Sequence, residues 1–242
     1  MKFRIMFALC FLLVPFGARA EVTFNFAKAK EYLEEIVYAN APQRVTFYCG
    51  CQYEADKDVN AASCGYEPRK NAKRGKRIEW EHIVPASRFG SWRNCWQQGD
   101  STCVTRKGKH YKGRRCCQKA DPQFAHMEAD LHNLVPAVGE LNGDRSNLRM
   151  GKVAGEQRQY GACDFEINRK AHITEPGDKI RGDVARAYLY MHQTYNMPLS
   201  PQELEMFELW SMLDPISQEE LRRNRLITEI QGNSNPFISQ GF

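Results

Sequence analysis

Apolar residues recur at helical spacing near the start of the chain and throughout its last third. Phe26, Ala29, Leu33, Ile36 and Val37 predict a helix over Phe24–Asn40. Three more helices are predicted downstream, over Asp183–Tyr195, Ser200–Leu213 and Ser217–Ile230. The last two open with Ser200-Pro201-Gln202-Glu203 and Ser217-Gln218-Glu219-Glu220, in which a serine cap precedes a glutamate by three positions. The C-terminal third is therefore expected to be helical.

The middle of the chain predicts shorter elements. Val45–Cys51 is rich in residues that favour β structure and predicts a strand, and Arg77–Val84 predicts a second. Ala125–Leu134 predicts a helix, and Asn142-Gly143 is a dipeptide typical of a tight turn. The expected fold class is α+β, mostly helical, with a small strand element.

The first twenty residues have the pattern of a cleaved secretory signal. Lys2 and Arg4 precede an apolar stretch over Ile5–Phe16, and Ala18-Arg19-Ala20 provides a small-x-small exit. No later stretch approaches the ~20 apolar residues of a membrane-spanning helix, so we expect no membrane role. Residues 21–242 contain no linker, repeat or low-complexity tract, which predicts one domain that acts as a monomer.

Cysteine usage agrees with export. Eight cysteines follow the signal, and an even number in an exported chain favours disulfides. Their connectivity stays open, although the adjacent Cys116 and Cys117 are expected to bond elsewhere rather than to each other. A zinc site is the alternative, but the C-x2-C repeats typical of such sites are absent from the sequence.

Positive charge is concentrated in one part of the chain. Without the signal the net charge is +2, from 31 basic and 29 acidic residues. Residues 68–119 hold 15 Lys and Arg against three acidic residues, so this window carries +12 and the rest carries −10. The same window contains Trp80, Trp92 and Trp96, whose rings either stack on bases or pack in the core. The window predicts contact with a polyanion, with a solvated basic loop as the alternative.

The candidate chemistry lies inside this basic window. His82 is a candidate general base, because an imidazole is largely neutral at physiological pH. Glu81 and, about fifty residues later, Asn133 supply the oxygen donors that Mg²⁺ prefers. Together they predict metal-assisted phosphodiester hydrolysis. Neighbours on a regular strand point to opposite faces, so the backbone must turn near His82. His132 is expected to be structural.

Several motifs, in order along the chain, resemble the bacterial endonuclease I family of exported nucleases. They are Phe47-Tyr48-Cys49-Gly50-Cys51, Ser63-Cys64-Gly65-Tyr66, Ile78–Ala86, Leu131-His132-Asn133-Leu134-Val135-Pro136 and Gly139–Asn147. The resemblance implies a disulfide-stapled fold with a ββα-metal, or His-Me finger, catalytic element. It implies that His82 is the general base and that Glu81 and Asn133 hold one Mg²⁺. The implied activity is sequence-nonspecific cleavage of DNA, and often RNA, to 5′-phosphate products, in the periplasm or outside the cell.

The residue that grips the substrate phosphate is less clear from the sequence. Periplasmic relatives carry an arginine shortly after Cys-Trp-Gln, where this chain reads Gln97-Gln98-Gly99-Asp100-Ser101. A longer basic stretch, 106–115, resembles the secreted branch of the family instead. Arg106, Arg114 and Arg145 are therefore the candidates for this role, with an ordinary surface position as the alternative for each.

Two other classes of function are compatible with parts of the pattern. One is a noncatalytic, disulfide-stapled DNA-binding or DNA-uptake protein that uses the basic window. The other is a zinc-dependent hydrolase. No helix-turn-helix or zinc-finger module is recognisable, so contact with backbone phosphates rather than base reading is expected.

Overall fold

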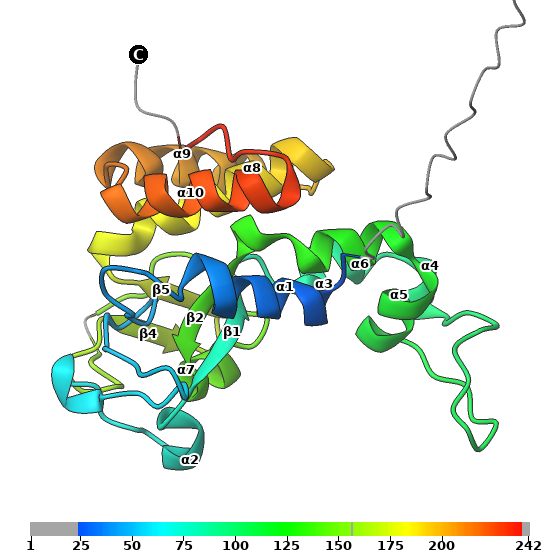
Figure 1. The fold of residues 1–242 in the computed structure, drawn as a ribbon, viewed down its shortest axis with the longest axis horizontal. Coiled ribbons are helices and arrows are strands. Elements are labelled where there is room, and N and C mark those ends of the chain that lie inside the picture. The colour runs from blue at the N-terminus through cyan, green and yellow to red at the C-terminus, as the bar shows by residue number, and fades with distance from the viewer. Residues whose placement is uncertain (1–23, 156, 239–242) are drawn as a thin grey trace, which may run out of the picture.

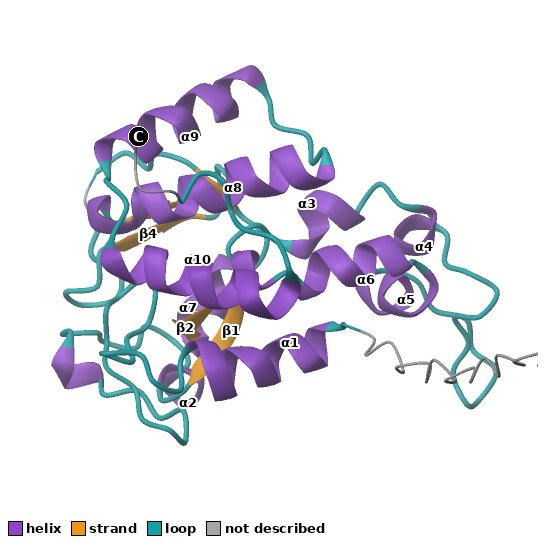
Figure 2. Cartoon of the chain, turned by 45° about the horizontal axis from the view of Figure 1, so that its top comes forward, coloured by secondary structure: helices purple, strands orange, loops and turns teal. Residues whose placement is uncertain are grey.

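Long C-terminal helices and a series of short helices surround two small sheets in the computed structural model, which describes residues 24–155 and 157–238 (Figures 1 and 2). The predicted signal, residues 1–20, lies outside the described residues. The α-helices are α1 (Phe26–Tyr32), α2 (Ala72–Gly75), α3 (Ala86–Gly90), α4 (Asn94–Gln97), α5 (Arg114–Ala120), α6 (Pro122–Ala129), α7 (Gly139–Arg145), α8 (Arg181–Tyr195), α9 (Pro201–Leu213) and α10 (Gln218–Gln231). The strands are β1 (Ile78–His82), β2 (Leu134–Val138), β3 (Arg149–Met150), β4 (Phe165–Asn168) and β5 (Ile173–Pro176). Three 3₁₀ turns and one π-helical turn complete these elements: Ala61–Ser63, Leu131–Asn133, Asp178–Ile180 and Leu33–Val37.

β1 and β2 form an antiparallel pair near the centre of the molecule. Glu81 pairs with Val135 and His82 with Leu134, so the end of β1 meets the start of β2. Every residue of β2 is buried, and α7 begins directly after it. α7 contacts both strands. The second sheet has the order β3-β5-β4. In Figure 1, α8, α9 and α10 form a layer above the β1–β2 pair, and α4 and α5 lie to one side.

The sequence predicted the long helices well. α8, α9 and α10 occupy the three predicted C-terminal ranges, and both serine capping boxes are formed, at Ser200 and Ser217. The first predicted helix is present as α1, which continues into the π-helical turn and ends before Asn40. The strand predicted over Arg77–Val84 is β1. The mixture of helices with small sheets agrees with the expected fold class.

The prediction of a strand over Val45–Cys51 was wrong. Only Val45 forms an isolated bridge, with Gln52, and the chain turns back between Thr46 and Gly50. Gly50 has a φ of +67°, which favours glycine. Disulfides at Cys49 and Cys51 fix the two sides of this turn.

Two other local predictions needed correction. Asn142 and Gly143 lie inside α7 rather than in a tight turn, because the helix packs against both β1 and β2. The helix predicted over Ala125–Leu134 begins earlier and ends at Ala129 as α6. Asp130 is extended, with ψ of 118°, and its carboxylate caps the following 3₁₀ turn through the N–H of His132. In both cases, tertiary contacts override local propensity.

Four disulfides join all eight cysteines that follow the signal: Cys49–Cys163, Cys51–Cys64, Cys95–Cys117 and Cys103–Cys116. Cys116 and Cys117 thus bond to different partners, as expected. A zinc site built from thiolates is excluded, since none of these eight cysteines remains a free thiol. Within the described ranges, no helix is both long and apolar enough to cross a bilayer.

Candidate active site

The predicted histidine and its neighbour line a cavity of about 480 Å³ at the end of β1. Its polar lining includes Glu81 and His82 from β1, Arg114 from the start of α5, and Asn142 and Arg145 from α7. The alternation of a regular strand does not separate Glu81 from His82, because β1 ends at His82 and the chain bends directly afterwards. Both side chains therefore reach one cavity.

Glu81 is a buried carboxylate held from two sides. Its Oε1 accepts hydrogen bonds from the Tyr48 hydroxyl, 3.1 Å away, and from Nη1 of Arg145, 3.0 Å away. Only 3 % of the residue is exposed. Burial raises the pKa of Glu81 to about 7, although the charge of Arg145 acts in the opposite direction. A cation bound nearby would favour the ionised form of this carboxylate.

His82 is held in one tautomer by the protein backbone. Its Nε2 lies 2.8 Å from the carbonyl oxygen of Glu128. Because a carbonyl oxygen only accepts hydrogen bonds, Nε2 carries the proton and Nδ1 carries the lone pair. Burial and the charge of Arg114 lower the pKa of His82 to about 3, so the ring is neutral at physiological pH. The unprotonated Nδ1 is the atom that can accept a proton.

Arg114 lies beside this lone pair. Its Nη2 is 3.5 Å from Nδ1 of His82, and its Nε donates to the carboxylate of Glu128. Gln118 also donates to that carboxylate, over 2.8 Å. Glu128 therefore orients the histidine through its backbone and the arginine through its side chain. The Arg114 side chain remains 42 % exposed, so the guanidinium stays open to an anion entering from solvent.

The structure does not bring Asn133 into the cavity. Its side chain is fully buried, its Oδ1 accepts from the Val84 N–H over 2.7 Å, and its Nδ2 donates to the Val84 carbonyl over 3.0 Å. Both ends of the carboxamide thus hold the chain where it leaves β1. Asn142 lines the cavity instead, and none of the described residues forms a hydrogen bond with its carboxamide.

The three candidate arginines have different positions. Arg114 is at the cavity, as described above. Arg145 is fully buried, and besides Glu81 it donates to the carbonyl oxygens of His82, over 2.7 Å, and of Ile83. Its guanidinium therefore serves to fix the end of β1 and is not open to substrate. Arg106 is exposed in the loop between α4 and α5, outside the residues that line the cavity.

Aromatic rings form one wall of the cavity. Trp80, Trp96 and Phe26 line it, and the Phe26 ring lies 4.9 Å from the His82 ring. Trp92 is 57 % exposed on the neighbouring surface, with the guanidinium of Arg93 over its ring. Two of the three tryptophans of the basic window are thus at the site. His132 bonds to the Asn233 carbonyl and packs edge-on against Tyr190, which agrees with the structural role expected for it.

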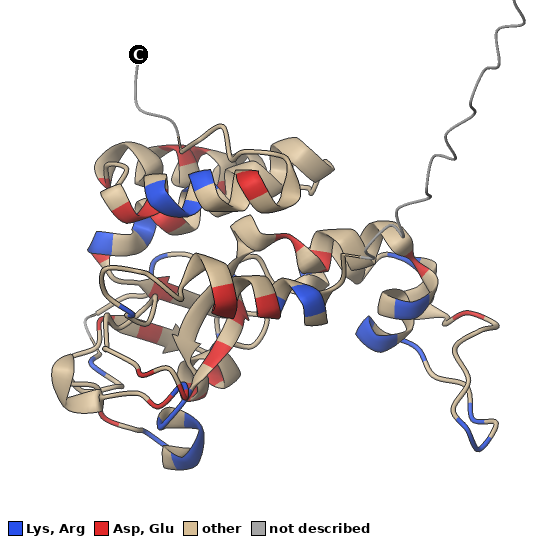
Figure 3. Ribbon diagram, in the orientation of Figure 1, with Lys and Arg blue, Asp and Glu red and all other residues tan. Residues whose placement is uncertain are grey.

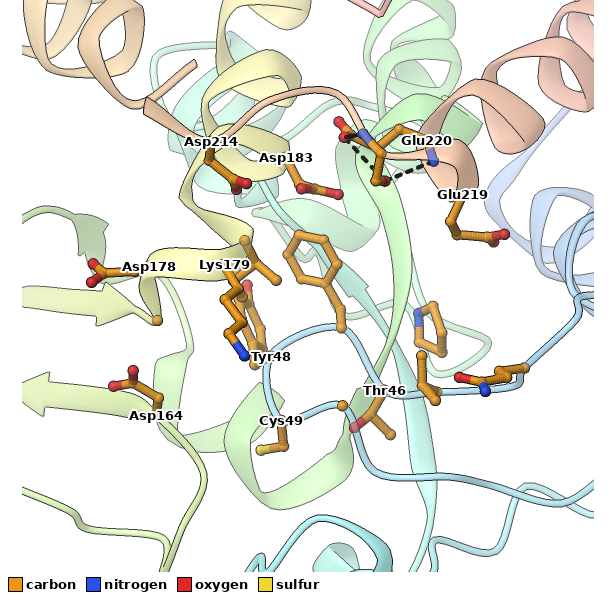
Figure 4. Close-up of a pocket in the computed structure, with 18 of the residues that line it drawn as sticks. Thr46, Tyr48, Cys49, Asp164, Asp178, Lys179, Asp183, Asp214, Glu219 and Glu220 are labelled. Atoms are coloured by element: carbon orange, nitrogen blue, oxygen red, sulfur yellow. Dashed lines mark hydrogen bonds between the residues drawn. The ribbon is translucent and has the colours of Figure 1, made fainter. Parts of the chain in front are cut away.

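A larger cavity of about 720 Å³ lies on the other side of the turn at Thr46–Gly50 (Figure 4). Six carboxylates line it, against two cationic side chains: Asp164, Asp178, Asp183, Asp214, Glu219 and Glu220, with Lys179 and Arg223. Tyr48 also lines it, while its hydroxyl bonds to Glu81. An acidic cavity repels a polyanion, so the smaller cavity is the candidate site despite its size.

Comparison with known proteins shows the family of the chain. Residues 25–241 match the family described as Endonuclease I. The chain belongs to the Endonuclease I family. It is 43 % identical over 217 residues to Endonuclease-1 of Buchnera aphidicola subsp. Acyrthosiphon pisum, covering 88 % of this chain and 80 % of the relative. It is 42 % identical over 243 residues to an extracellular deoxyribonuclease of Aeromonas hydrophila, covering 98 % of each, and 41 % identical over 233 residues to a periplasmic deoxyribonuclease of that organism, covering 95 % and 91 %.

Family membership makes this chain a nuclease, and the four disulfides together with the exported relatives make it an exported one. The candidate site contains residues that the sequence did not predict. Glu128 acts partly through its backbone carbonyl, which no side-chain pattern reveals. Asn142 was read as a turn residue, and Phe26 as a core position of the first helix. For Asn142, its position shortly after the strand that pairs with β1 was the available signal.

Proposed function

We propose that the chain is a Mg²⁺-dependent endonuclease that hydrolyses phosphodiester bonds of DNA with little sequence preference and leaves 5′-phosphate ends. The observation that carries the proposal is the unprotonated Nδ1 of His82 in the same cavity as the carboxylate of Glu81 and the carboxamide of Asn142. The named activities of the deoxyribonuclease relatives support DNA as the substrate. We further propose that residues 21–242 act as one domain and as a monomer.

The arrangement of β1, β2 and α7 supports assignment to the ββα-metal nucleases. Two antiparallel strands lead directly into a helix that packs on both, and the cavity lies where His82 and α7 meet. Asn142 is therefore proposed as the second metal ligand beside Glu81, in place of Asn133. Within the described ranges, no three His, Cys, Asp or Glu side chains cluster as metal ligands. A carboxylate with one amide oxygen fits Mg²⁺, which takes few protein ligands and keeps several waters.

The residues of the chain then divide the chemistry between them. Nδ1 of His82 accepts the proton of the attacking water, while the Glu128 carbonyl holds Nε2–H and keeps the ring oriented. Arg114 binds a nonbridging oxygen of the scissile phosphate through its exposed guanidinium. Arg145 holds Glu81 in place and is a positioning residue. Bound Mg²⁺ supplies charge stabilisation at the phosphate and at the departing 3′ oxygen.

Plasmid digestion tests the catalytic assignment. Wild-type protein should degrade circular plasmid with Mg²⁺ and not with EDTA, and RNA is assayed in parallel. His82→Ala should lower turnover by at least ~100-fold, the usual contribution of a general base, while salt-sensitive binding to DNA persists. Equal loss of binding and cleavage would instead favour a noncatalytic DNA-binding protein.

Variants of Asn142 and Asn133 distinguish the proposed metal ligand from the structural amide. Asn142→Ala should weaken Mg²⁺ binding in calorimetry and leave the melting temperature nearly unchanged, because its carboxamide has no partner within the described residues. Asn133→Ala should destabilise the fold by about 2 kcal/mol or more, because the buried Val84 N–H and carbonyl lose their partners. Loss of Mg²⁺ binding in a folded Asn133→Ala protein with none in Asn142→Ala would return the ligand role to Asn133.

A further inference from the structure

A short basic hairpin, residues 104–112, projects between α4 and α5 and is here called the basic arm. Val104 and His110 form an antiparallel bridge across it, and the Thr105 N–H donates to the Lys109 carbonyl over 2.9 Å. In Figure 1 the loop that contains it extends away from the remainder of the molecule, and Figure 3 shows Lys and Arg at its tip. Arg106–His110 are all exposed.

The arm is anchored rather than loose. Cys103, at its start, is joined to Cys116, and the Tyr111 N–H donates to the Cys103 carbonyl over 2.9 Å. The next residue of α5, Cys117, is joined to Cys95. Both cysteines of the Cys103–Cys116 bridge are fully buried. The base of the arm is therefore fixed to the same short helix whose first residue is Arg114.

The charge of the arm has no internal compensation. Arg106, Lys107, Lys109 and Lys112 lie within it, and it contains no acidic residue. Of the described residues, none forms an ion pair with these four side chains. Like charges held close together on an ordered hairpin repel one another. A bound polyanion offsets that repulsion and releases its own condensed counterions.

We propose that the basic arm binds the sugar-phosphate backbone of the substrate beyond the scissile phosphate, and so sets affinity and salt dependence rather than the chemical step. The proposal rests on the proposed nuclease function and adds a second contact region to its site. Lys107 is four residue steps from Cys103, so at ~3.3 Å per step the arm reaches ~13 Å. That distance equals about four steps of one nucleic-acid strand, at ~3.4 Å each.

A nucleic-acid strand suits the arm better than an anionic lipid surface. The exposed tip, Arg106–His110, carries no apolar side chain that could enter a bilayer interface. Its C-terminal side leads through Gly113 directly to Arg114, which lies 3.5 Å from His82. A strand whose phosphate sits at Arg114 would thus continue along the arm.

The test measures how DNA binding depends on salt. In a His82→Ala background with EDTA, binding of a 30-base-pair duplex is compared for the intact arm, for Arg106→Gln/Lys107→Gln/Lys109→Gln, and for a control with the same charge loss, Lys152→Gln/Lys170→Gln/Lys179→Gln. The control residues are exposed and lie near β3, β4 and β5, on the opposite side of the molecule in Figure 1. The slope of log Kd against log salt should fall by roughly 2 to 3 for the arm variant, at ~0.9 per phosphate contact. The control should change it far less.

Cleavage kinetics, measured with His82 intact, complete the test. The arm variant should lose roughly 10-fold in kcat/KM on plasmid at ~0.15 M salt, with the loss in KM, as expected when binding rather than chemistry is affected. Equal slopes for the arm and control variants, or a defect confined to anionic lipid vesicles, would overturn the proposal. If the protein with an intact arm binds DNA but does not cut it, the nuclease proposal fails while the arm proposal is still decided by the slopes.

Discussion

Phe26 is the residue by which the first helix reaches the active site. The Phe26 ring packs 4.9 Å from the His82 ring. The guanidinium of Arg114 lies over the Phe26 ring, 5.5 Å from its centroid. Phe26 thus contacts the proposed base and the proposed phosphate ligand at once. It limits where both can move, which makes it a positioning residue.

Replacing Phe26 should affect catalysis more than stability. Phe26→Ala should lower kcat on the order of 10-fold, because misplacement of a reacting group is costly even when small, and Phe26→Tyr should restore most of it. Phe24→Ala is the matched control, since Phe24 stacks on Tyr32, 5.8 Å away, outside the cavity lining. Steady-state kinetics and melting temperatures of the three variants check this. Equal kcat values for Phe24→Ala and Phe26→Ala would contradict it.

Glu81 links metal binding to pH. Burial raises its pKa to about 7 in the metal-free protein, so below pH 7 a proton must leave before Mg²⁺ binds. Because the pKa of Glu81 is higher in the folded than in the unfolded protein, protonation of Glu81 stabilises the metal-free fold. This contribution is complete below the unfolded pKa of about 4.3 and is lost as the pH rises through 7. The rise in melting temperature on adding Mg²⁺ should therefore be larger at pH 8 than at pH 6. In Glu81→Gln the two rises should be equal and small.

The sequence predicted the two residues proposed to react, which the structure places in one cavity, but not the residues that hold them in position. Glu81 and His82 stand out because they are adjacent and carry the chemistry. Asn133 looked equally suitable, yet an amide beside a histidine reads the same whether it faces a cavity or binds the backbone of Val84. Arg145 likewise reads as a surface cation, and only its contacts with Glu81 and with two backbone carbonyls reveal a buried clamp.

At the level of elements, α8 and α10 are joined by a buried ion pair. Arg186 donates to both carboxylate oxygens of Glu220, over 2.6 and 2.8 Å, and neither side chain has more than 3 % exposure. Glu220 is also the capping-box residue of α10. The start of α10 is thus fixed to the middle of α8.

Neutralising that pair should destabilise the helical layer. Glu220→Gln removes the nearer counter-charge of the buried Arg186 guanidinium and leaves only the longer contact with Asp183, 3.5 Å away. The free energy of unfolding should therefore fall by about 3 kcal/mol. Glu219→Gln is the control, because Glu219 pairs with Arg222 at a surface where its side chain is 42 % exposed, and such pairs contribute about 1 kcal/mol or less. Denaturant titration measures both. Similar losses in the two variants would mean that burial of the pair does not matter.

Elements with long periodic patterns were predictable, whereas most short ones other than β1 were not. α8, α9 and α10 carry both a repeating apolar face and their own cap residues. In contrast, the shape of 45–51 is set by Gly50 and by bridges to Cys163 and Cys64, one of which is distant in sequence. α7 contains a turn-forming dipeptide, but packing on β1 and β2 holds it helical.

On the scale of the whole molecule, two of the disulfides are expected to differ in their effect on activity. Cys95–Cys117 holds α5, the helix that presents Arg114, one turn away from Cys117. Cys51–Cys64 closes a loop whose residues do not line the cavity. The first should matter for activity as well as stability, and the second for stability alone.

Paired serine variants separate these effects. Cys95→Ser/Cys117→Ser and Cys51→Ser/Cys64→Ser open loops of similar length, so each should cost about 3 kcal/mol of unfolding free energy. At a temperature where both remain folded, only the first should show a raised KM for plasmid, because Arg114 is less well fixed. Melting curves and kinetics at that temperature decide the point. An equal rise in KM for both variants would exclude a specific role for Cys95–Cys117.

The sequence also shows which part of the chain is basic, but not where these charges lie in the folded protein. Residues 68–119 were recognised as basic, but charge counting does not show that part of this charge lies on an ordered hairpin while Arg93 is buried in a pair with Asp121. Nor does it show that six carboxylates from 164–220 meet in one cavity. Separation of these two fields keeps a polyanion at one face of the protein.

Formation of the Cys49–Cys163 bridge depends on export. The bridge spans 114 positions, and both β1 and β2 lie between its ends. Because thiols stay reduced in the cytosol, there is an interval before export in which this bridge cannot form. During that interval the turn carrying Tyr48 is not yet fastened behind Glu81. Full activity is therefore expected only after the polypeptide has left the compartment that contains the genome.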